Sequence, residues 1–494
     1  MNPASERQER SLFGFKFGYW MLCNIEMFER MAYFLVRSVV AVYIMQADDP
    51  GGLHFTAAQK GTIFAWWFVF QSVLPMFTGG YADRYGYKKT IAFSVTLNII
   101  GFVMMAYLRT YVGFFAGVLT LATGTAFFKP GLQGSLAQNL DKSNSSVGWG
   151  IFYWIVNVGA FIAHPLAGLL QVGIGWKAVF LTSAGLTACN YLFLFTFKDF
   201  ASGASKTESP LQVFVRTIKN IFEPRLVSWL LIMSCFWLMM YQLWDLHPNF
   251  LTDWTDSSGV ASFLPNFLSH ETDRGWQVLQ QNMLALNSLL IVICMIPVSW
   301  IVRRLRTLEA MVIGMIVATG GILIAGLTAN GWVFLLGVLF FSSGEMLTGP
   351  KKNEYLGLIA PPGKKGLYLG YVNIPVGIGG FFGSKLAGYV YGHYGEKAVL
   401  AQRYLLEHTP LGQGKTWNGD PDALTKLLDV PRTDAMVKLQ EVTGLDPVQA
   451  THMLWNTYSP HLYVWLPFAA IGVLAVIALV IFAQMAKRWD DMNA

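Results

Sequence analysis

Charged residues are scarce in this chain: Asp, Glu, Lys and Arg make up only 13% of its 494 residues. A soluble protein of this length usually carries about 25% of such residues. Hydrophobic residues instead reach 54%, and many lie in long runs. Each run approaches the roughly 20 residues that a helix needs to cross a bilayer. The composition excludes an ordinary soluble domain and predicts an all-α protein that crosses a membrane many times.

Cysteine is also rare, and its four positions match no metal motif. All four lie inside apolar runs, so we expect no disulfide and no metal site: Cys23, Cys189, Cys235 and Cys294. The first ten residues lack an apolar core before a cleavage site, so we expect no cleaved signal peptide. No nucleophile triad or phosphate-binding loop is visible, so we do not expect an enzyme, and we expect no cofactor other than protons.

The net charge of +6 does not indicate nucleic-acid binding, because the basic residues sit in short loops between apolar runs. These loops alternate along the chain, and by the positive-inside rule both termini are cytoplasmic. Windowed hydropathy predicts about twelve spans. They lie near residues 15–46, 58–82, 88–108, 112–138, 148–172, 176–198, 226–250, 277–302, 308–328, 331–359, 367–392 and 461–486.

The predicted spans fall into two six-helix halves, residues 1–198 and 226–494, joined by a cytoplasmic linker at 199–225. Residues 211–222 alternate at helical spacing, which fits an amphipathic surface helix and fits a plain loop equally. Residues 393–460 are polar and form a predicted non-cytoplasmic loop with short helical patterns at Ala423–Leu428 and Pro447–Trp455. A lid, a partner site and a tolerated insertion all remain open, with insertion as the default.

Four charges occupy the first apolar run: Glu26, Glu29, Arg30 and Arg37. A charge at bilayer depth costs at least about 2.5 kcal/mol, so such residues face a bundle interior or a wet cavity and pair with one another. Glu26, Arg30 and Arg37 share one helical face by their spacing of four and seven, and Glu29 lies beside it. The pattern predicts a proton relay or an ion-coupled substrate site.

We single out three further ionisable residues within predicted spans. Lys129 is a lone cation that needs an anion such as Glu26 or Glu29. Glu345 is a lone carboxylate near the middle of its span. With Arg37 and Lys129 it predicts a dipolar site that suits a zwitterion. His164 is more simply a packing histidine than a proton relay.

The turn after the second span, Gly79 to Lys89, resembles the signature G-x-x-x-D-R-x-G-x-K/R-K of the major facilitator superfamily. The resemblance implies two pseudo-symmetric halves of six helices and assigns Asp83 and Arg84 to gating. It says nothing about the substrate. The stretch E-M-F-E-R-M-A-Y-F is more specific, because it resembles the E-x-x-E-R-F-x-Y-Y signature of the proton-dependent oligopeptide transporter family.

Further motifs in both halves resemble the same family: F-K-P at Phe128, N-x-G at Asn157, L-N at Leu286, and E-M-L-T-G-P at Glu345. The resemblance implies proton-coupled uptake of di- and tripeptides by alternating access, with Glu26, Glu29, Arg30 and Lys129 in proton coupling. Arg37 and Lys129 would bind the peptide carboxylate and Glu345 its amino terminus. The backbone would contact Tyr33, Asn157, Gln242 and Asn287. Trp237 and Tyr241 would line side-chain pockets, although packing explains both aromatics equally well.

The chain departs from the family at Lys351 and Lys352, where small and apolar residues are usual. If either lysine enters the site, the substrate would carry an extra acidic group or not be a peptide; if both face the cytoplasmic mouth, peptide transport stands.

A receptor without transport is a third possibility, which the retained Glu and Arg cluster opposes. We expect a monomer that works in a lipid bilayer, in a bacterial inner membrane.

Overall fold

The computed structural model describes residues 11–141, 144–197, 221–302, 304–360, 368 and 370–488. The chain divides into two compact units. Unit 1 comprises Met1–Val36, Phe70–Ala163 and Lys177–Glu223, and unit 2 comprises Arg37–Val69, His164–Trp176 and Pro224–Ala494. The predicted linker helix at 211–222 lies almost entirely outside the described residues, so it stays a prediction.

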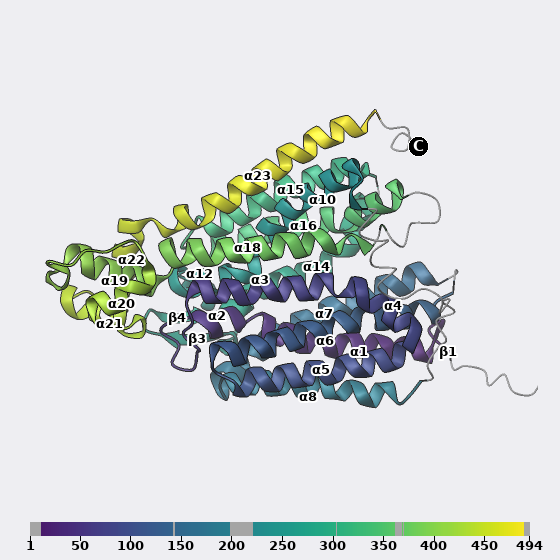
Figure 1. The fold of residues 1–494 in the computed structure, drawn as a ribbon, viewed down its shortest axis with the longest axis horizontal. Helices are drawn as coiled ribbons and strands as arrows, with labels where there is room; N and C mark the ends of the chain where they lie inside the picture. Colours follow the sequence, from purple (N-terminus) through teal and green to yellow (C-terminus); the bar gives the residue numbers. More distant parts are fainter. Residues whose placement is uncertain are drawn as a thin grey trace, which may run out of the picture. The chain divides into compact units, whose positions relative to one another are not determined.

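Unit 1 is built from long apolar helices, with α5 packed along α6 and α4 in contact with both (Figure 1). It contains α4 (Pro75–Tyr85), α5 (Tyr87–Tyr107), α6 (Tyr111–Gln138) and nearly all of α1 (Phe17–Arg37) and α8 (Trp176–Leu194). It also contains the first part of α7 (Ser145–Gly173), whose residues from His164 onward belong to unit 2. The two-residue strands β1 (Ser11–Leu12) and β2 (Phe15–Lys16) pair before α1. Phe128, Leu132 and Leu136 lie one turn apart on α6 and are fully buried in the core that includes Leu22 of α1.

Unit 2 holds most of the remaining helices, and its tightest layers pair α15 with α16 and α10 with α18 (Figure 1). Before the cap, its elements are α2 (Val40–Met45), α3 (Ala57–Val73), α10 (Pro224–Met240), α11 (Gln242–Asp245), α12 (His247–Trp254), α13 (Ser258–Ala261), η1 (Asn266–Leu268), β3 (Ser269–Thr272), β4 (Gly275–Val278), α14 (Gln280–Val302), α15 (Thr307–Gly326), α16 (Gly331–Ile359) and α18 (Asn373–Tyr394). Strands β3 and β4 form an antiparallel hairpin.

Nine helices among the described residues are long and apolar enough to cross a bilayer. Most predicted spans coincide with one helix, and α16 has the predicted bounds. Three predicted spans instead break into shorter helices: 15–46 into α1 and α2, 58–82 into α3 and α4, and 226–250 into α10, α11 and α12. Proline explains part of this, because α4 begins at Pro75 and α12 has Pro248 in its first turn, where a missing N–H is tolerated.

Helix α3 approaches α18 so closely that only glycine fits at the contact. A Cβ on Gly61 would lie 2.5 Å from the Ser384 carbonyl oxygen and 3.1 Å from the Gly388 Cα. A Cβ on Gly388 would lie 2.6 Å from the Ala57 carbonyl oxygen. Small residues let helices pack backbone to backbone inside a membrane. This contact brings the first turns of α3 against the end of α18.

Residues 397–458, here called the cap, fold as four helices rather than as an open loop. They are α19 (Lys397–His408), α20 (Leu424–Leu428), α21 (Ala435–Thr443) and α22 (Pro447–Tyr458), with short 3-10 turns η2 (Pro410–Gly412), η3 (Pro421–Ala423) and η4 (Arg432–Asp434). The two short helices predicted in this region are confirmed. Buried leucines give the cap its own apolar core: Leu400, Leu405, Leu424, Leu428, Leu439 and Leu454. The cap lies beyond the end of α18, and α23 (Pro460–Ala486) follows it (Figure 1).

Candidate functional site

The three charges in the middle of α1, here called the α1 cluster, satisfy one another within that helix. The Arg30 guanidinium donates to both oxygens of Glu29, at 2.5 and 2.7 Å, and lies 3.5 Å from a Glu26 oxygen. The three side chains are nearly inaccessible to solvent, with exposed fractions of 2–6%. Two carboxylates share one guanidinium, so the cluster carries an excess negative charge that a proton or another cation can neutralise.

A lysine from another helix of unit 1 lies near the α1 cluster. Lys129 of α6 lies within electrostatic range of Glu26, Glu29 and Arg30. Its excess positive charge offsets the negative charge of the cluster. The Arg30 guanidinium also lies 4.8 Å from the centre of the Tyr33 ring, and the Tyr33 hydroxyl donates to Gln71 at 3.1 Å.

The N-x-G motif on α7 contributes a close contact and a polar residue. A Cβ on Gly159 would lie 3.0 Å from the Met27 carbonyl oxygen, so the glycine allows α7 to approach α1 beside the α1 cluster. Asn157 is 9% exposed, and its amide donates to the Tyr153 carbonyl oxygen at 3.0 Å within α7. The motif therefore has a packing reason at Gly159, and Asn157 keeps its amide oxygen for another partner.

Arg37, the last residue of α1, forms an ion pair with Asp245, which the sequence analysis did not select. Its guanidinium donates to one Asp245 carboxylate oxygen and, at 3.0 Å, to the Trp244 carbonyl oxygen. The second carboxylate oxygen of Asp245 accepts a hydrogen bond from Ser384 of α18 at 2.7 Å. Three aromatic rings of α3 lie within 6 Å of the guanidinium: Phe64, Trp67 and Phe68.

Lys60 extends this group of buried polar residues and was also missed. Its ammonium donates to the Asp245 carbonyl oxygen at 2.9 Å and to the Asn249 side chain at 2.7 Å, and only 1% of Lys60 is exposed. Lys60 and Asp245 are lone charges within predicted spans, so the rule that selected Lys129 and Glu345 would also have found them. We call Arg37, Asp245, Ser384, Lys60 and Asn249 the Arg37 network.

Glu345 of α16 is held by an asparagine from another helix. Asn287 of α14 donates to a Glu345 carboxylate oxygen at 3.0 Å and lies 3.0 Å from the Ser342 hydroxyl. Asn287 is buried, whereas Glu345 is partly exposed. The amide orients the carboxylate, and Lys352 of the same helix lies within electrostatic range of it. The predicted pair of Glu345 and Asn287 is thus brought together by the fold.

The two lysines of α16 have different surroundings. Lys351 is buried and donates to the Leu305 carbonyl oxygen at 3.1 Å and to Glu354 at 3.0 Å. Lys352 instead places its ammonium 4.2 Å from the centre of the Trp237 ring, a cation–π contact. Trp237 in turn packs against Tyr241 at 5.3 Å between ring centres. Lys352 therefore lies beside the predicted pocket aromatics, while Lys351 ties α16 to the α14–α15 connection.

Four further predicted residues lie on α4, α7 and α11. Gln242 is fully buried, and its amide donates to the Leu238 carbonyl oxygen at 2.7 Å within its own chain segment. His164 is buried in α7. Arg84 is exposed at the end of α4, near the Tyr85 ring at 6.0 Å. Asp83 lies in the last turn of α4, and its side chain is outside the described ones.

Comparisons with known proteins connect these features to a family. A model of the Major Facilitator Superfamily matches residues 22–398. The chain is 25% identical over 297 residues to the uncharacterized transporter YclF of Bacillus subtilis (strain 168), which covers 53% of this chain and 57% of that protein. It is 25% identical over 188 residues to dipeptide and tripeptide permease A of Proteus mirabilis (strain HI4320), covering 37% and 38%. The aligned stretches thus span less than two thirds of these two relatives.

Solved structures share the fold over nearly the whole chain. A peptide transporter POT in complex with sulfate superimposes with a TM-score of 0.70 at 14% identity, covering 98% of this chain and 97% of that one. A mutant of the nucleoside transporter NupG gives 0.69 at 13% identity, covering 94% and 99%. Such low identities show the fold alone. The family model covers more than half of the chain, so this integral membrane protein belongs to the Major Facilitator Superfamily.

Proposed function

We propose that this protein is a proton-coupled symporter that imports di- and tripeptides by alternating access. The observation that carries the proposal is the α1 cluster, in which two buried carboxylates share the guanidinium of Arg30. Ionisable groups within membrane spans are costly and mark ion or proton pathways by default. The permease relatives and the peptide-transporter fold support a peptide as the cargo.

Charges of both signs support a zwitterionic substrate. Arg37 and Lys129 are cations that suit a peptide carboxylate, and Arg37 has the planar, forked donors that bind a carboxylate well. Glu345 is held by a neutral amide and suits the ammonium of the peptide. Tyr33, Asn157, Gln242 and Asn287 are the proposed partners of the peptide backbone. No metal or organic cofactor enters this mechanism, since protons serve as the coupling ion.

The ion pair of Arg37 and Asp245 supplies a way to couple protons to substrate binding. A peptide carboxylate and the Asp245 carboxylate compete for the same guanidinium. A proton on Asp245 would remove its charge and free Arg37 for the peptide, while Ser384 holds the Asp245 side chain and Lys60 holds its backbone carbonyl group. Proton uptake and peptide binding would then favour each other, as coupled binding requires.

A second candidate substrate class is a small metabolite or peptide with an extra acidic group. The position of Lys352 against Trp237 favours it, because this cation lies two helical turns from Glu345 on the same side of α16. The structural likeness to a nucleoside transporter also shows that this fold alone does not define the cargo. Lys351 does not contribute to this idea, because Leu305 and Glu354 hold its ammonium.

We also propose an orientation with both termini in the cytoplasm of a bacterium and the protein in the inner membrane, as a monomer. Basic residues such as Arg304 and Arg306 at the α14–α15 connection support this orientation. The cap and residues 46–56 then lie on the opposite, non-cytoplasmic side, here called the outer face.

The test is uptake of labelled di-alanine and tri-alanine into proteoliposomes, with and without an inward proton gradient, beside Glu345→Gln. Gradient-driven uptake that is lost in the variant supports peptide symport and the role of Glu345 together. Peptides with an acidic side chain, and acidic metabolites, form the second panel. If folded, inserted protein takes up only the second panel, the acidic-substrate candidate replaces the peptide assignment; if it takes up neither, the transport proposal is wrong.

A further inference from the structure

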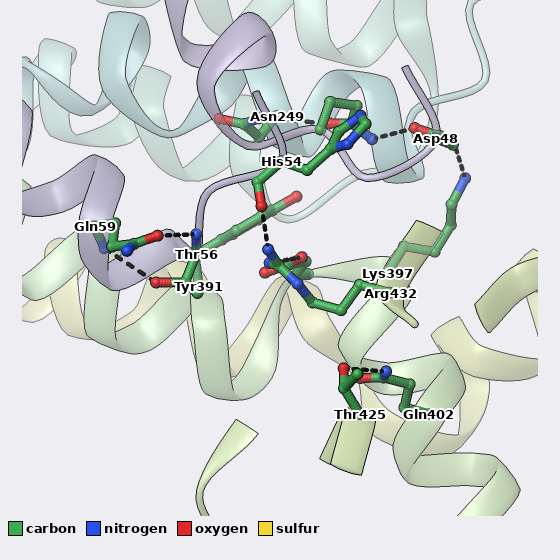
Figure 2. A network of polar contacts seen from close by, with 12 residues as sticks. Asp48, His54, Thr56, Gln59, Asn249, Tyr391, Lys397, Gln402, Thr425 and Arg432 are labelled. Carbon is green, nitrogen blue, oxygen red and sulfur yellow. Dashed lines mark hydrogen bonds and ion pairs between the residues drawn. The ribbon is translucent and has the colours of Figure 1, made fainter. Parts of the chain in front are cut away.

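The cap contacts residues 46–56, the connection between α2 and α3, through Arg432 and Lys397. Arg432 of η4 places one guanidinium nitrogen 2.7 Å from Glu396 and donates from another to the His54 carbonyl oxygen at 2.6 Å (Figure 2). The Arg432 and Glu396 side chains are largely buried, with exposed fractions of 15% and 4%. Lys397, at the start of α19, adds a longer ion pair of 3.7 Å to Asp48 in the same connection (Figure 2).

The connection is held in a fixed shape that presents this carbonyl group. His54 has a positive φ of 57°, a conformation that non-glycine residues adopt at an energetic cost. Its ring nitrogen contacts the Asp49 carbonyl oxygen at 2.6 Å, and the Asp49 carboxylate accepts from Gly51 and from the Trp176 ring. Strained backbone persists where the surrounding structure enforces it, often at sites that move or bind. Here the fixed backbone presents the His54 carbonyl oxygen as the acceptor for Arg432 in this connection.

The connection also closes over buried carboxylates. Residues 45–48 and the cap enclose a cavity of about 20 Å³ lined by Asp253, Glu396 and Arg432. Gln46 donates to Asp253 at 2.6 Å, and Tyr391 donates to the other oxygen of Asp253 at 2.6 Å. The titratable groups around Glu396 are Asp48 of the connection, Lys60 of α3, Asp253 of α12, Tyr391 of α18, Lys397 of α19, Asp422 of η3 and Arg432 of η4.

The two contacts of the Arg432 guanidinium, with Glu396 and with the His54 carbonyl oxygen, behave differently when such a transporter opens its outer face. Glu396 and Arg432 both belong to the second half of the chain, so their ion pair stays intact. His54 and Asp48 pack within unit 2 in this structure but belong to the predicted first half, residues 1–198, and the alternating access of the proposed function moves one predicted half against the other. Contacts between the halves on one face must break when that face opens. The Arg432–His54 and Lys397–Asp48 contacts therefore exist in only one state of the cycle.

We propose that Arg432 is a gating residue: positioned by Glu396, it latches residues 46–56 to the cap and holds the outer face closed. The cap is then a working part of the transporter rather than a tolerated insertion. This inference rests on the alternating access of the proposed function, and it does not depend on which substrate is carried.

The latch also predicts a dependence on outside pH. Burial raises the pKa of Glu396 to about 7, although the Arg432 guanidinium beside it lowers that pKa. Opening removes residues 45–48 from above Glu396, exposes it to water and returns its pKa toward its usual acidic range. A group whose pKa is higher in the closed state stabilises that state at low pH, and this stabilisation is lost as the pH rises through about 7. Acid therefore favours the closed outer face.

The test measures access to a cysteine that the closed face buries, with no substrate present. Ala57 begins α3 and is 1% exposed, so Ala57→Cys is the reporter, in a chain whose four native cysteines are serine. The purified protein in nanodiscs is treated with a polar maleimide at pH 6 and pH 8. Rates are normalised to a second chain with an exposed cysteine at Ser258, which corrects for thiol reactivity. Size-exclusion profiles show which variants are folded.

Arg432→Ala should label about tenfold faster than the parent, since hydrogen bonds to a charged group are lost. Its neighbour Thr433→Ala, whose hydroxyl contacts only Asp434 in the described structure, is the matched control and should label at the parental rate. Arg432→Lys keeps the charge and should label at an intermediate rate, and it replaces the alanine variant if that variant does not fold. Equal labelling of parent and folded Arg432 variants would disprove the latch.

Glu396→Gln tests the pH dependence separately. The parent should label faster at pH 8 than at pH 6, and the neutral glutamine should keep the slow rate at both. A parental pH dependence that survives in Glu396→Gln would remove Glu396 as the responding group. Because no substrate is used, failure of peptide uptake and failure of the latch are distinguished by independent measurements.

Discussion

The α1 cluster and the Arg37 network are both buried groups of opposite charges, but their partners come from different distances along the chain. In the α1 cluster, Arg30 pairs with its neighbour Glu29 and with Glu26, one turn away. In the Arg37 network, Arg37 pairs with Asp245, which lies 208 residues away in the sequence and bonds to Ser384 of α18. One group is built on a single helix, and the other joins five helices.

This difference indicates different roles. Bonds within one helix survive when that helix moves as a rigid body, so the α1 cluster can hold a proton site through the cycle. Bonds between α1, α3, α11 and α18 change whenever those helices shift, so the Arg37 network responds to conformation. A packed element with two discrete arrangements is what couples two sites. The Arg37 network, with its proposed proton on Asp245, suits that element, and the α1 cluster suits a second proton site that persists through the cycle.

The largest expected effect comes from Asp245→Asn. The change removes the charge opposite the buried Arg37, and breaking a buried pair costs about 3–5 kcal/mol. We expect gradient-driven uptake to fall by at least ~100-fold and Ala57→Cys labelling to rise, because the network that joins α1 to α11 and α18 is weakened. Proteoliposome uptake and maleimide labelling measure the two effects.

Two further variants test whether the α1 cluster and the Arg37 network have different roles. Glu29→Gln, in the α1 cluster, should also reduce gradient-driven uptake but leave the labelling rate unchanged, because its bonds are local to one helix. Asp429→Asn, an exposed carboxylate at the end of α20, is the matched control and should change neither. If Glu29→Gln and Asp245→Asn shift labelling equally, the proposed division of roles between the two groups fails.

The sequence predicted most helices because hydropathy runs are local signals. It missed the break at Ser38 because that residue lies in a continuous apolar run, and its carbonyl group is satisfied by Gln280 from a distant segment. The cap was missed as a folded unit because its core is assembled from single leucines spaced over some sixty residues. Short polar helices in water depend on tertiary packing, which a local pattern does not contain.

Residues of the candidate site could be selected from the sequence where charges lay within an apolar run and matched a family motif. Glu26, Glu29, Arg30 and Glu345 were found in this way. Lys60 and Asp245 gave the same local signal without a motif and were passed over. Their pairing depends on which helices the fold brings together, and Arg432 gives no local signal at all, since it is an ordinary charge in a polar segment.

A moderate effect is expected from Gly61→Ala, which tests whether the Arg37 network needs the close approach of α3 to α18. The added methyl group would lie 2.5 Å from a backbone oxygen of α18, and overpacking costs about 1–3 kcal/mol. We expect a lower melting temperature and roughly tenfold slower uptake. Gly185→Ala in α8 has open space within 4 Å and should be neutral or slightly stabilising, by up to about 1 kcal/mol. Equal melting temperatures for the two variants would contradict the packing argument.

The smallest expected effect separates the two lysines of α16. Lys352→Met should change the preference between a peptide with an acidic side chain and di-alanine by about fivefold, since a partly exposed charge contributes about 1 kcal/mol. Lys351→Met removes the bonds to Leu305 and Glu354, so it should lower the melting temperature and leave the preference unchanged. Competition uptake and thermal unfolding measure the two outcomes. The prediction fails if Lys351→Met changes the substrate preference or if Lys352→Met leaves it unchanged. The contact of Lys352 with Trp237 would then serve packing, and selectivity would arise elsewhere.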